Sequence, residues 1–356
     1  MKHRWLLFNL IFLIFSTSFS TVQGLNLSRI FKKNRTRTEM LMAVGDLNFC
    51  GNFEKLILAD PGYPWVNVKP VLEQATILMG NLEVPFCDNG RPYLKKTWVL
   101  KADPRTVQAL VVAGFDLVTL ANNHIMDFGP RSLEQTLKTL RQAKIKATGA
   151  GRNQAEARQP AFIKTPSGVT LAFLAYSTTY PAEFWATSNR PGTAYGKPAV
   201  FLADIKAARA QADHVIVSFH WSNELQTIPA DYQLQYARQC INAGAALVVG
   251  HHPHVLQGIE TYNGGLIAYS LGNFAFGSLT TKVKDSIILT VNFNKTKLLQ
   301  ATVYPLNVQN YEVRYQPRLR VGADAVRVLH DLQQLSAPFH TTIKINNGVG
   351  TIHIAK

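Results

Sequence analysis

The 356-residue sequence is poor in charged residues and poorer still in cysteine. Charged side chains make up 17% of the chain and hydrophobic ones 47%. This balance excludes global disorder and is enough for a sizeable core, in one large domain or two ordinary ones. The three cysteines, Cys50, Cys87 and Cys240, allow at most one disulfide within the chain.

Acidic residues are scarce relative to basic ones. Lys and Arg number 37 against 22 Asp and Glu, which gives a formal net charge of +15. Lys2, Arg4 and the net four positive charges of residues 25–39 account for six of these, which leaves +9. A basic body attracts anionic substrates, polymers or membrane surfaces, although a generic basic pI explains the charge equally well. The sequence carries no nucleic-acid-binding motif, so we expect no nucleic-acid partner.

Residues 1–24 have the pattern of a signal peptide or an N-terminal anchor. Lys-His-Arg at 2–4 precedes an apolar stretch at 5–15, and polar and small residues follow. The apolar stretch is shorter than the ~20 residues that span a bilayer. Residues 25–38 are basic and polar, as in a flexible linker. We therefore expect an exported protein that is periplasmic, secreted or anchored to the membrane and facing outward.

The cysteines have a second implication in an exported protein, where a pair of them can be oxidised. Cys50 and Cys87 each follow an expected strand by a few residues, at the same edge of the sheet. A Cys50–Cys87 disulfide is therefore one hypothesis, and two free thiols are the alternative at about even odds. Cys240 lies on an expected helix and is interpreted as a small buried hydrophobe.

Short apolar, β-branched runs alternate with amphipathic stretches along most of the chain, which predicts an α/β sheet protein. Strands are expected near 40–44, 76–79, 97–102, 115–120, 215–219 and 245–249. Helices are expected near 71–75, 103–113, 199–212, 229–244 and 323–335, and after Pro130. Strand pairs are expected around 166–168, 263–265 and Lys295, with a last strand near Ile352.

Histidine, carboxylate and amide side chains recur where these strands end. Gly250-His251-His252-Pro253-His254 follows the strand at 245–249 directly, and ligand sites in open α/β sheets lie at the carboxyl ends of strands. A polar turn with surface histidines is the plainer interpretation of that segment alone. Other strand exits contribute polar residues of the same kinds: Asp46, Asn81, Glu83, Asn123, His124 and His220.

The convergence of these side chains predicts a metal site. Mixed oxygen and nitrogen donors suit Mn, Fe or Zn, as one ion or a pair, better than Ca or Mg. Two ions about 3.5–4 Å apart would clamp a phosphoryl group. A neighbouring histidine that is not a ligand would then donate a proton to the leaving oxygen.

Taken in order, the motifs resemble those of the CapA capsule-synthesis family. That family includes the poly-γ-glutamate synthesis accessory proteins and is related to calcineurin-like metallophosphatases. The resemblance covers roughly residues 40–280 and is carried by GDLNFCG, GNLE, LANNHIMDFG, FHW with Glu224, VVGHHPHVLQGIE and YSLGNFAFG. It implies an αββα sandwich of two mixed β-sheets flanked by helices, over residues 39–320, followed by a C-terminal helix and strand extension at 321–356.

The resemblance also implies roles for single residues. His124 would be the general acid and Asp127 its orienting partner, although capping of the next helix is an alternative for Asp127. His251 is less certain than its neighbours, because the superfamily's Gly-His-x-His fits this stretch in two ways. The implied metal ligands are Asp46, Glu83, Asn123, His220, His252 and His254. The implied substrate-binding residues are Asn81, Trp221, Glu224 and His251.

Two positions depart from the metallophosphatase pattern. Asn48 stands where an Asp-x-His motif has its histidine, and Asn81 stands where the second motif has its aspartate. One metal subsite therefore has fewer strong ligands, which leaves two functions open. The first is a metal-dependent, phosphoesterase-like hydrolase of capsule or poly-γ-glutamate biosynthesis. The second is a non-catalytic exported accessory protein that binds or guides an anionic cell-envelope polymer, in contact with a membrane synthase complex.

The segment at 177–197 is long for a loop and rich in Thr, Tyr, Pro and Gly. It also holds Tyr180, Phe184, Trp185 and Tyr195. A loop of this length is often a substrate wall or lid, and the alternative is that its aromatic rings pack beneath it.

Overall fold

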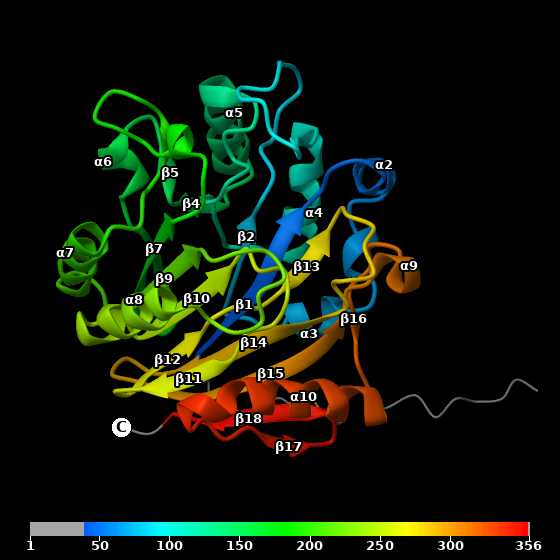
Figure 1. Ribbon diagram of the computed structural model, residues 1–356, viewed down its shortest axis with the longest axis vertical. Helices are drawn as coiled ribbons and strands as arrows, with labels where there is room; N and C mark the ends of the chain where they lie inside the picture. Colours follow the sequence, from blue (N-terminus) through cyan, green and yellow to red (C-terminus); the bar gives the residue numbers. More distant parts are fainter. Residues whose placement is uncertain (1–38, 355–356) are drawn as a thin grey trace, which may run out of the picture. The chain divides into compact units, whose positions relative to one another are not determined.

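The computed structural model describes residues 39–354 (Figure 1). The predicted signal or anchor at 1–24 and the predicted linker at 25–38 lie outside the described residues. Within residues 39–354, none of the helices is both long and apolar enough to span a membrane.

The larger of two main sheets has ten strands, in the order β17-β18-β15-β14-β1-β2-β3-β4, with β13 paired to β1 and β16 paired to β15. Strands β1 to β4 and β13 run parallel, and β14 to β18 are joined by antiparallel pairings. The strands are β1 (Glu39–Asn48), β2 (Ile77–Leu82), β3 (Leu117–Thr119), β4 (Lys146–Thr148), β13 (Asn273–Phe276), β14 (Asp285–Phe293), β15 (Leu298–Asn307), β16 (Arg318–Leu319), β17 (Lys344–Asn346) and β18 (Val349–His353).

The second sheet has six strands in the order β11-β12-β10-β9-β7-β6. Its four central strands are parallel, and the two edges are antiparallel hairpins. A separate two-stranded ribbon joins β5 (Ala150–Gly151) to β8 (Gly192–Thr193). The six strands are β6 (Ala161–Lys164), β7 (Thr170–Ser177), β9 (His214–His220), β10 (Leu247–His251), β11 (Ile259–Tyr262) and β12 (Gly265–Ala268).

Helices connect the parallel strands, as a parallel sheet requires. Asp103 caps the turn before α4, because its side chain accepts a hydrogen bond from the Arg105 amide at 2.8 Å. The helices are α2 (Asn52–Ala59), α3 (Lys69–Leu72), α4 (Val107–Ala113), α5 (Gly129–Gln142), α6 (Gln154–Ala157), α7 (Pro198–Arg209), α8 (Asp231–Asn242), α9 (Asn310–Val313) and α10 (Gly322–Ser336). Short 3₁₀ turns are η1 (Tyr63–Trp65), η2 (Pro104–Thr106), η3 (Ala182–Phe184) and η4 (Ala337–Phe339).

The main core lies between the two sheets. Alternate residues of each strand face this core because side chains in a strand point to opposite faces in turn. In β7, Leu171 and Phe173 join the core between the sheets, whereas Ala172 and Leu174 join the cluster on the other face. The ten-stranded sheet contributes inner residues such as Leu41 and Met79.

Helices cover the outer faces of both sheets. Helices α7 and α8 pack on the six-stranded sheet, where Phe201 and Ile241 belong to the outer cluster (Figure 1). On the larger sheet, the Trp65 ring stacks on Phe274 at 5.6 Å and its indole N–H donates to the Ala109 carbonyl at 2.7 Å. The predicted αββα sandwich of two mixed sheets is confirmed.

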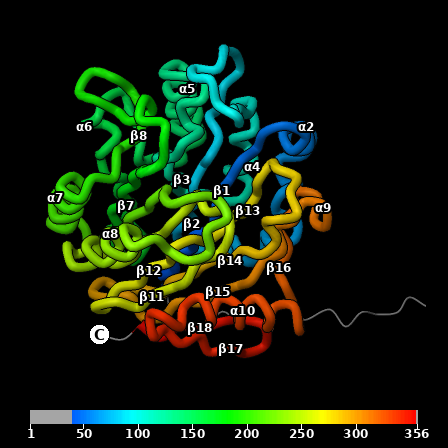
Figure 2. The backbone as a smooth tube through the Cα atoms, in the orientation of Figure 1, coloured from blue at the N-terminus to red at the C-terminus, as the bar shows by residue number. Residues whose placement is uncertain are grey.

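Residues 321–354 contain a helix and strands that complete the larger sheet. Strand β18 pairs with β15, with Ile352 opposite Ala301. Helix α10 runs along β15 and β18, and its Val328 and Leu332 belong to the core between the sheets (Figure 2). The C-terminal segment is therefore an edge of the same compact unit.

Two further expectations differ from the structure. All three cysteines are free, so the hypothesis of a Cys50–Cys87 disulfide is wrong here. Cys87 Sγ instead donates to the Asn89 carbonyl at 2.9 Å. The expected strand at 97–102 is also absent from the described structure, in which only Ala102 forms a bridge, to Phe86.

Candidate metal centre

The polar residues at the carboxyl ends of the parallel strands of both sheets lie close together. In the larger sheet, Asp46 of β1 lies opposite Asn81 of β2 and Asn273 of β13. In the six-stranded sheet, His251 of β10 lies opposite His220 of β9. Because each group stands at the carboxyl ends of parallel strands, both sheets deliver their polar side chains to the same site.

Asp46 is the centre of the hydrogen-bond network and is fully buried. Its Oδ1 accepts a hydrogen bond from Asn81 Nδ2 at 2.8 Å and lies 3.2 Å from His251 Nδ1. Its Oδ2 accepts from the His252 amide at 3.2 Å and lies 3.3 Å from His254 Nδ1. One carboxylate of the larger sheet thus contacts all three histidines at the end of β10.

Glu83 is also fully buried, one residue beyond β2. Its Oε1 lies 3.4 Å from His220 Nε2 and 3.8 Å from His254 Nε2. Neither carboxylate oxygen has a hydrogen-bond partner within the described chain. A buried carboxylate in this state is costly unless a cation compensates it.

His220 is held from both sides by amides. Its Nε2 lies 2.9 Å from Asn123 Oδ1, and its Nδ1 lies 3.3 Å from Asn81 Nδ2. Asn81 Oδ1 also accepts a hydrogen bond from Asn122 Nδ2 at 3.2 Å. These amides fix the orientation of the imidazole, the usual task of groups behind a metal-ligating histidine.

The turn after β10 places two histidine side chains at unusual backbone angles. His252 has φ 92° and His254 has φ 59°, both in the left-handed region. Such conformations cost about 1–3 kcal/mol each and collect at functional sites. The ring of His252 lies 4.7 Å from that of His220, and His254 Nδ1 lies 2.8 Å from Asn273 Oδ1.

The electrostatics of the site separate two kinds of group. Burial opposes ionisation of Asp46, but contacts with His251 and His254 outweigh it and hold the pKa of Asp46 well below its usual range. Burial and the nearby charge of Asp46 raise the pKa of Glu83 well above its usual range. Despite burial, the charges of Glu83 and Asp46 raise the pKa of His254 to about 10.

The other two buried histidines behave in the opposite way. Burial and the charge of His254 lower the pKa of His252 to about 3. Burial, followed by the charge of His252, holds the pKa of His220 well below its usual range. Both rings are therefore neutral near pH 7, the form in which imidazole binds a metal.

The donor set fits a divalent metal. Ligand atoms of Glu83, His252 and His254 lie within 4.8 Å of one another, and so do those of Asp46, Glu83 and His220. His252 Nδ1 and both Glu83 oxygens are buried and have no hydrogen-bond partner in residues 39–354. Two overlapping groups that share Glu83 provide the mixed nitrogen and oxygen donors that suit Mn, Fe or Zn.

A second polar group, from the segment after β3, adjoins these ligands. His124 Nδ1 lies 2.7 Å from Asp127 Oδ2, and that same oxygen accepts a hydrogen bond from the Leu100 amide at 2.7 Å. Burial lowers the pKa of His124, and the contact with Asp127 opposes the shift. Asn122 Oδ1 accepts hydrogen bonds from the amides of His124 and Ile125, so Asn122 shapes the turn that presents His124.

Sequence reasoning missed Lys96. Its ammonium group donates to Asp127 Oδ1 at 2.6 Å and to the Asn123 carbonyl, and it lies 3.4 Å from His124 Nδ1. The Lys96 side chain is 16% exposed and Asp127 is fully buried. Lys96 comes from a stretch without regular structure, where two consecutive lysines were the only available signal.

The four residues expected to bind substrate lie in different places. Trp221 is fully buried, donates its indole N–H to the Tyr269 carbonyl at 3.0 Å and stacks on Phe219, so its assignment to a substrate surface is wrong. Asn81 and His251 are each 1% exposed and contact Asp46. Glu224 is exposed, and its charge contributes to the raised pKa of Glu83.

Fold and site together define an αββα sandwich protein with a candidate divalent-metal centre between its two sheets. Residues 40–278 match the family described as "Bacterial capsule synthesis protein PGA_cap". The chain belongs to this family, and the resemblance drawn from its motifs is confirmed.

Two curated relatives and one solved structure illustrate the similarity. "Capsule biosynthesis protein CapA" of Bacillus anthracis is 34% identical over 78% of this chain and 69% of its own length. "PGA biosynthesis protein CapA" of Bacillus subtilis is 31% identical over 81% of this chain and 74% of its own length. Among solved structures, Haemophilus influenzae NAD nucleotidase (NadN) has a TM-score of 0.46 and 11% identity, covering 83% of this chain and 62% of that chain.

Proposed function

We propose that this protein is a metal-dependent, phosphoesterase-like hydrolase that acts in the synthesis of a capsule or a related anionic envelope polymer. The observation that carries the proposal is Glu83, whose carboxylate is buried without a hydrogen bond among histidines from the opposite sheet. A bound divalent ion would compensate this charge and supply Lewis acidity toward a phosphoryl oxygen. The residues that would hold it are Asp46, Glu83, His220, His252 and His254, with Asn123 beside them.

His124 is the group best placed to move a proton. Asp127 engages its Nδ1, which leaves Nε2 as the atom that can donate to a leaving oxygen. Lys96 holds Asp127 from the other side, so the ring orientation is set by two charged contacts. Hydrolysis of a phosphoester needs a positioned acid next to a charge-stabilising site, and the two groups adjoin each other here.

A second candidate function is that of a non-catalytic protein that binds or guides an anionic polymer. The observation that favours it is that Asn48 and Asn81, two uncharged amides, stand where the metallophosphatase pattern has a histidine and an aspartate. Asn48 Oδ1 accepts a hydrogen bond from the Cys50 amide at 3.1 Å, and Asn81 donates to Asp46. Neither residue adds a charge to the ligand set, which weakens the case for a second ion.

We also propose that the protein works outside the cytoplasm, next to a membrane synthase complex. The sequence pattern of residues 1–24 and the net positive charge of the remaining chain support this proposal. Periplasmic, secreted and outward-facing anchored forms share the prediction that the protein is found outside the cytoplasmic fraction. Recovery of the protein in the cytoplasmic fraction alone would contradict it.

The first experiment is elemental analysis of the purified full chain, compared with His252→Ala. His330→Ala is the matched control, because His330 is an exposed histidine on α10. Bound metal that is lost in His252→Ala and kept in His330→Ala supports the metal centre and justifies a screen of phosphoesters. His124→Ala should then keep its metal and lose turnover. A chain that binds no ion after incubation with Mn or Zn would refute the hydrolase and favour the polymer-binding function.

A further inference from the structure

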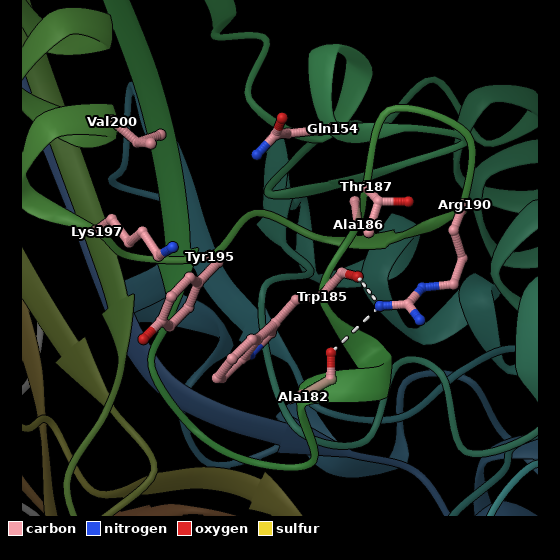
Figure 3. A pocket seen from close by; sticks show the side chains of 9 residues that line it. All are labelled: Gln154, Ala182, Trp185, Ala186, Thr187, Arg190, Tyr195, Lys197 and Val200. Carbon is pink, nitrogen blue, oxygen red and sulfur yellow. Dashed lines mark hydrogen bonds between the residues drawn. The ribbon is translucent and has the colours of Figure 1, made fainter.

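A second cavity lies outside the metal centre, against the long segment at 177–197. Its volume is about 180 Å³, and Figure 3 shows the side chains that line it. Pockets that enclose a drug-sized ligand usually measure roughly 300–1,000 Å³, so this cavity accommodates one unit of a larger ligand. The lining residues are Gln154, Ala182, Trp185, Ala186, Thr187, Arg190, Tyr195, Lys197 and Val200.

The cavity is positively charged. Arg190 and Lys197 line it, and none of its lining residues is acidic. Neither cation forms an ion pair within residues 39–354, and the Lys197 ammonium group lies over the Tyr195 ring, 5.4 Å from its centroid. Two cations that no carboxylate of the described chain neutralises favour an anionic ligand.

Arg190 is only partly used by the protein. One Nη donates to the Trp185 carbonyl at 3.0 Å and to the Ala182 carbonyl at 3.4 Å, which orients the guanidinium group (Figure 3). Its Nε is buried and has no hydrogen-bond partner in the described chain. A buried donor without a partner is rare in a folded protein and indicates that a further group binds there.

The walls suit an aliphatic stem between polar ends. The Trp185 and Tyr195 rings stack at 3.8 Å, and the Tyr180 ring lies 5.4 Å from Trp185. Ala182, Ala186 and Val200 add small apolar surface, and the amide of Gln154 offers a further hydrogen-bond donor, whereas the Thr187 hydroxyl already donates to Asn189 Oδ1 at 3.0 Å. Tyr180 is 75% exposed, so this row of rings continues from the cavity to the solvent.

One segment connects the cavity to the metal centre. Trp185 Nε1 donates to the Thr179 carbonyl at 3.1 Å, and the neighbouring Thr178 amide donates to the His220 carbonyl at 3.0 Å. The Phe184 ring lies under the Lys96 ammonium group, 5.0 Å from its centroid. The loop that lines the cavity on one side therefore lies against the His124 group on the other.

We propose that this cavity binds a carboxylate next to a short aliphatic segment, as one charged unit of the polymer that the protein acts on. A single carboxylate matches the cationic donors, which are the guanidinium N–H groups of Arg190 that its two carbonyl contacts leave free and the ammonium group of Lys197. Phosphate is the alternative anion, and competition with it is part of the test. The inference deepens the proposed function, because it identifies a charged group of the substrate and a place that holds it.

The test measures binding of a γ-linked glutamate tetramer to the full chain by calorimetry at low salt. Lys197→Gln should weaken binding about tenfold or more, the usual effect of losing one charged hydrogen bond. Val200→Trp should weaken it as well, because the new ring fills the cavity. Lys206→Gln is the matched control, since it removes an exposed charge from the same helix outside the cavity and should leave binding unchanged.

Two further measurements identify the ligand's charged group. The γ-linked isoglutamine tetramer, in which each α-carboxylate is replaced by a neutral amide, should not bind, and inorganic phosphate should not displace the glutamate tetramer. Displacement by phosphate at equal concentration would overturn the carboxylate assignment. Wild-type affinity in both Lys197→Gln and Val200→Trp, with the circular dichroism spectrum unchanged, would overturn the site.

The failure of this inference can be told apart from that of the proposed function. His252→Ala should lose metal and turnover but bind the tetramer as the wild type does. If His252→Ala abolishes binding and Lys197→Gln does not, the tetramer binds at the metal centre and the cavity has no part in it. If no phosphoester is turned over while the cavity variants still lose binding, the hydrolase is refuted and the carboxylate site stands.

Discussion

Replacement of Lys96 by Met isolates the charge that holds Asp127. Met keeps an unbranched side chain of similar length, so packing over the Phe184 ring is retained while the ammonium group is removed. The ion pair lost is short, at 2.6 Å, and one partner is fully buried. Because Asp127 keeps its hydrogen bond from the Leu100 amide and its contact with His124, the remaining charge is only partly compensated.

The expected loss of stability follows from this geometry. Removing one partner of a buried ion pair costs about 3–5 kcal/mol. Lys96 is 16% exposed, and two contacts to Asp127 remain, so we expect the lower end of that range, about 3 kcal/mol. Lys95→Met is the control, because this neighbouring lysine is exposed and forms no ion pair within residues 39–354. A surface substitution of that kind usually changes stability by about 0.5 kcal/mol or less.

Urea unfolding of the two variants gives the comparison, followed by metal analysis and turnover. Lys96→Met should keep its metal, because Lys96 is not a ligand, and should lose turnover because His124 is no longer held in place. The positioning role is wrong if Lys96→Met is as stable as Lys95→Met and turns over substrate equally fast. Loss of metal in Lys96→Met would instead show that the lysine supports the ligands themselves.

Three other predictions address the site and the fold. Glu83→Gln replaces a buried carboxyl group whose oxygens have no hydrogen bond within the described chain, so in chelator the variant should be at least as stable as the wild type. Added Mn or Zn should reverse that order in urea unfolding. Gly250→Ala would place Cβ 1.8 Å from the Tyr269 carbonyl oxygen, so it should lower the free energy of unfolding by more than the ~1–3 kcal/mol of ordinary overpacking. Gly114→Ala is the control, because Gly114 lies in open space at φ 80° and its replacement should cost only about 1–2 kcal/mol in the same assay. All three cysteines should react with a thiol reagent after denaturation without reductant, and a count of one thiol would mean that a disulfide forms after all. In the folded protein at pH 8, Cys50 should react slowly, because burial raises its pKa to about 11.

The gathering of the candidate ligands within each sheet was predictable because the residues that follow parallel strands lie at one edge of the sheet. Asp46 and Glu83 on one sheet and His220 and His252 on the other each follow an apolar run that the sequence shows clearly. The convergence needed no knowledge of how the two sheets pack. The αββα layering itself came from the resemblance of the motifs, since periodicity alone indicates strands and helices but not which sheet they join.

Trp221 was misplaced for a reason that the strand geometry explains. Side chains alternate between the two faces of a sheet, so the residue after His220 points to the opposite side. Trp221 accordingly joins Phe219 in the outer cluster under α7 and α8, where the two rings stack at 4.7 Å. A residue next to a site residue in extended backbone therefore points away from that site.

The role of Lys96 and the partner of the predicted C-terminal strand were beyond sequence reasoning, because both depend on contacts between distant segments. Lys96 meets Asp127 across 31 positions, from a stretch with neither helical nor strand periodicity. Strand β18 pairs with β15 about fifty positions earlier, and nothing in its own residues selects that partner. Such pairings are settled by tertiary packing and not by local propensity.

The division of the candidate ligands between two sheets would give a bound ion a mechanical role as well as a chemical one. Asp46 and Glu83 belong to the ten-stranded sheet, and His220, His252 and His254 belong to the six-stranded sheet. An ion held by both sets would cross-link the halves of a fold whose described cysteines are all free. Thermodynamic linkage then adds about 2.7 kcal/mol to the free energy of unfolding when free metal is a hundred times its dissociation constant. The lifetime of the folded protein would therefore follow the supply of metal in its surroundings, so that scarcity would remove the protein as well as its activity.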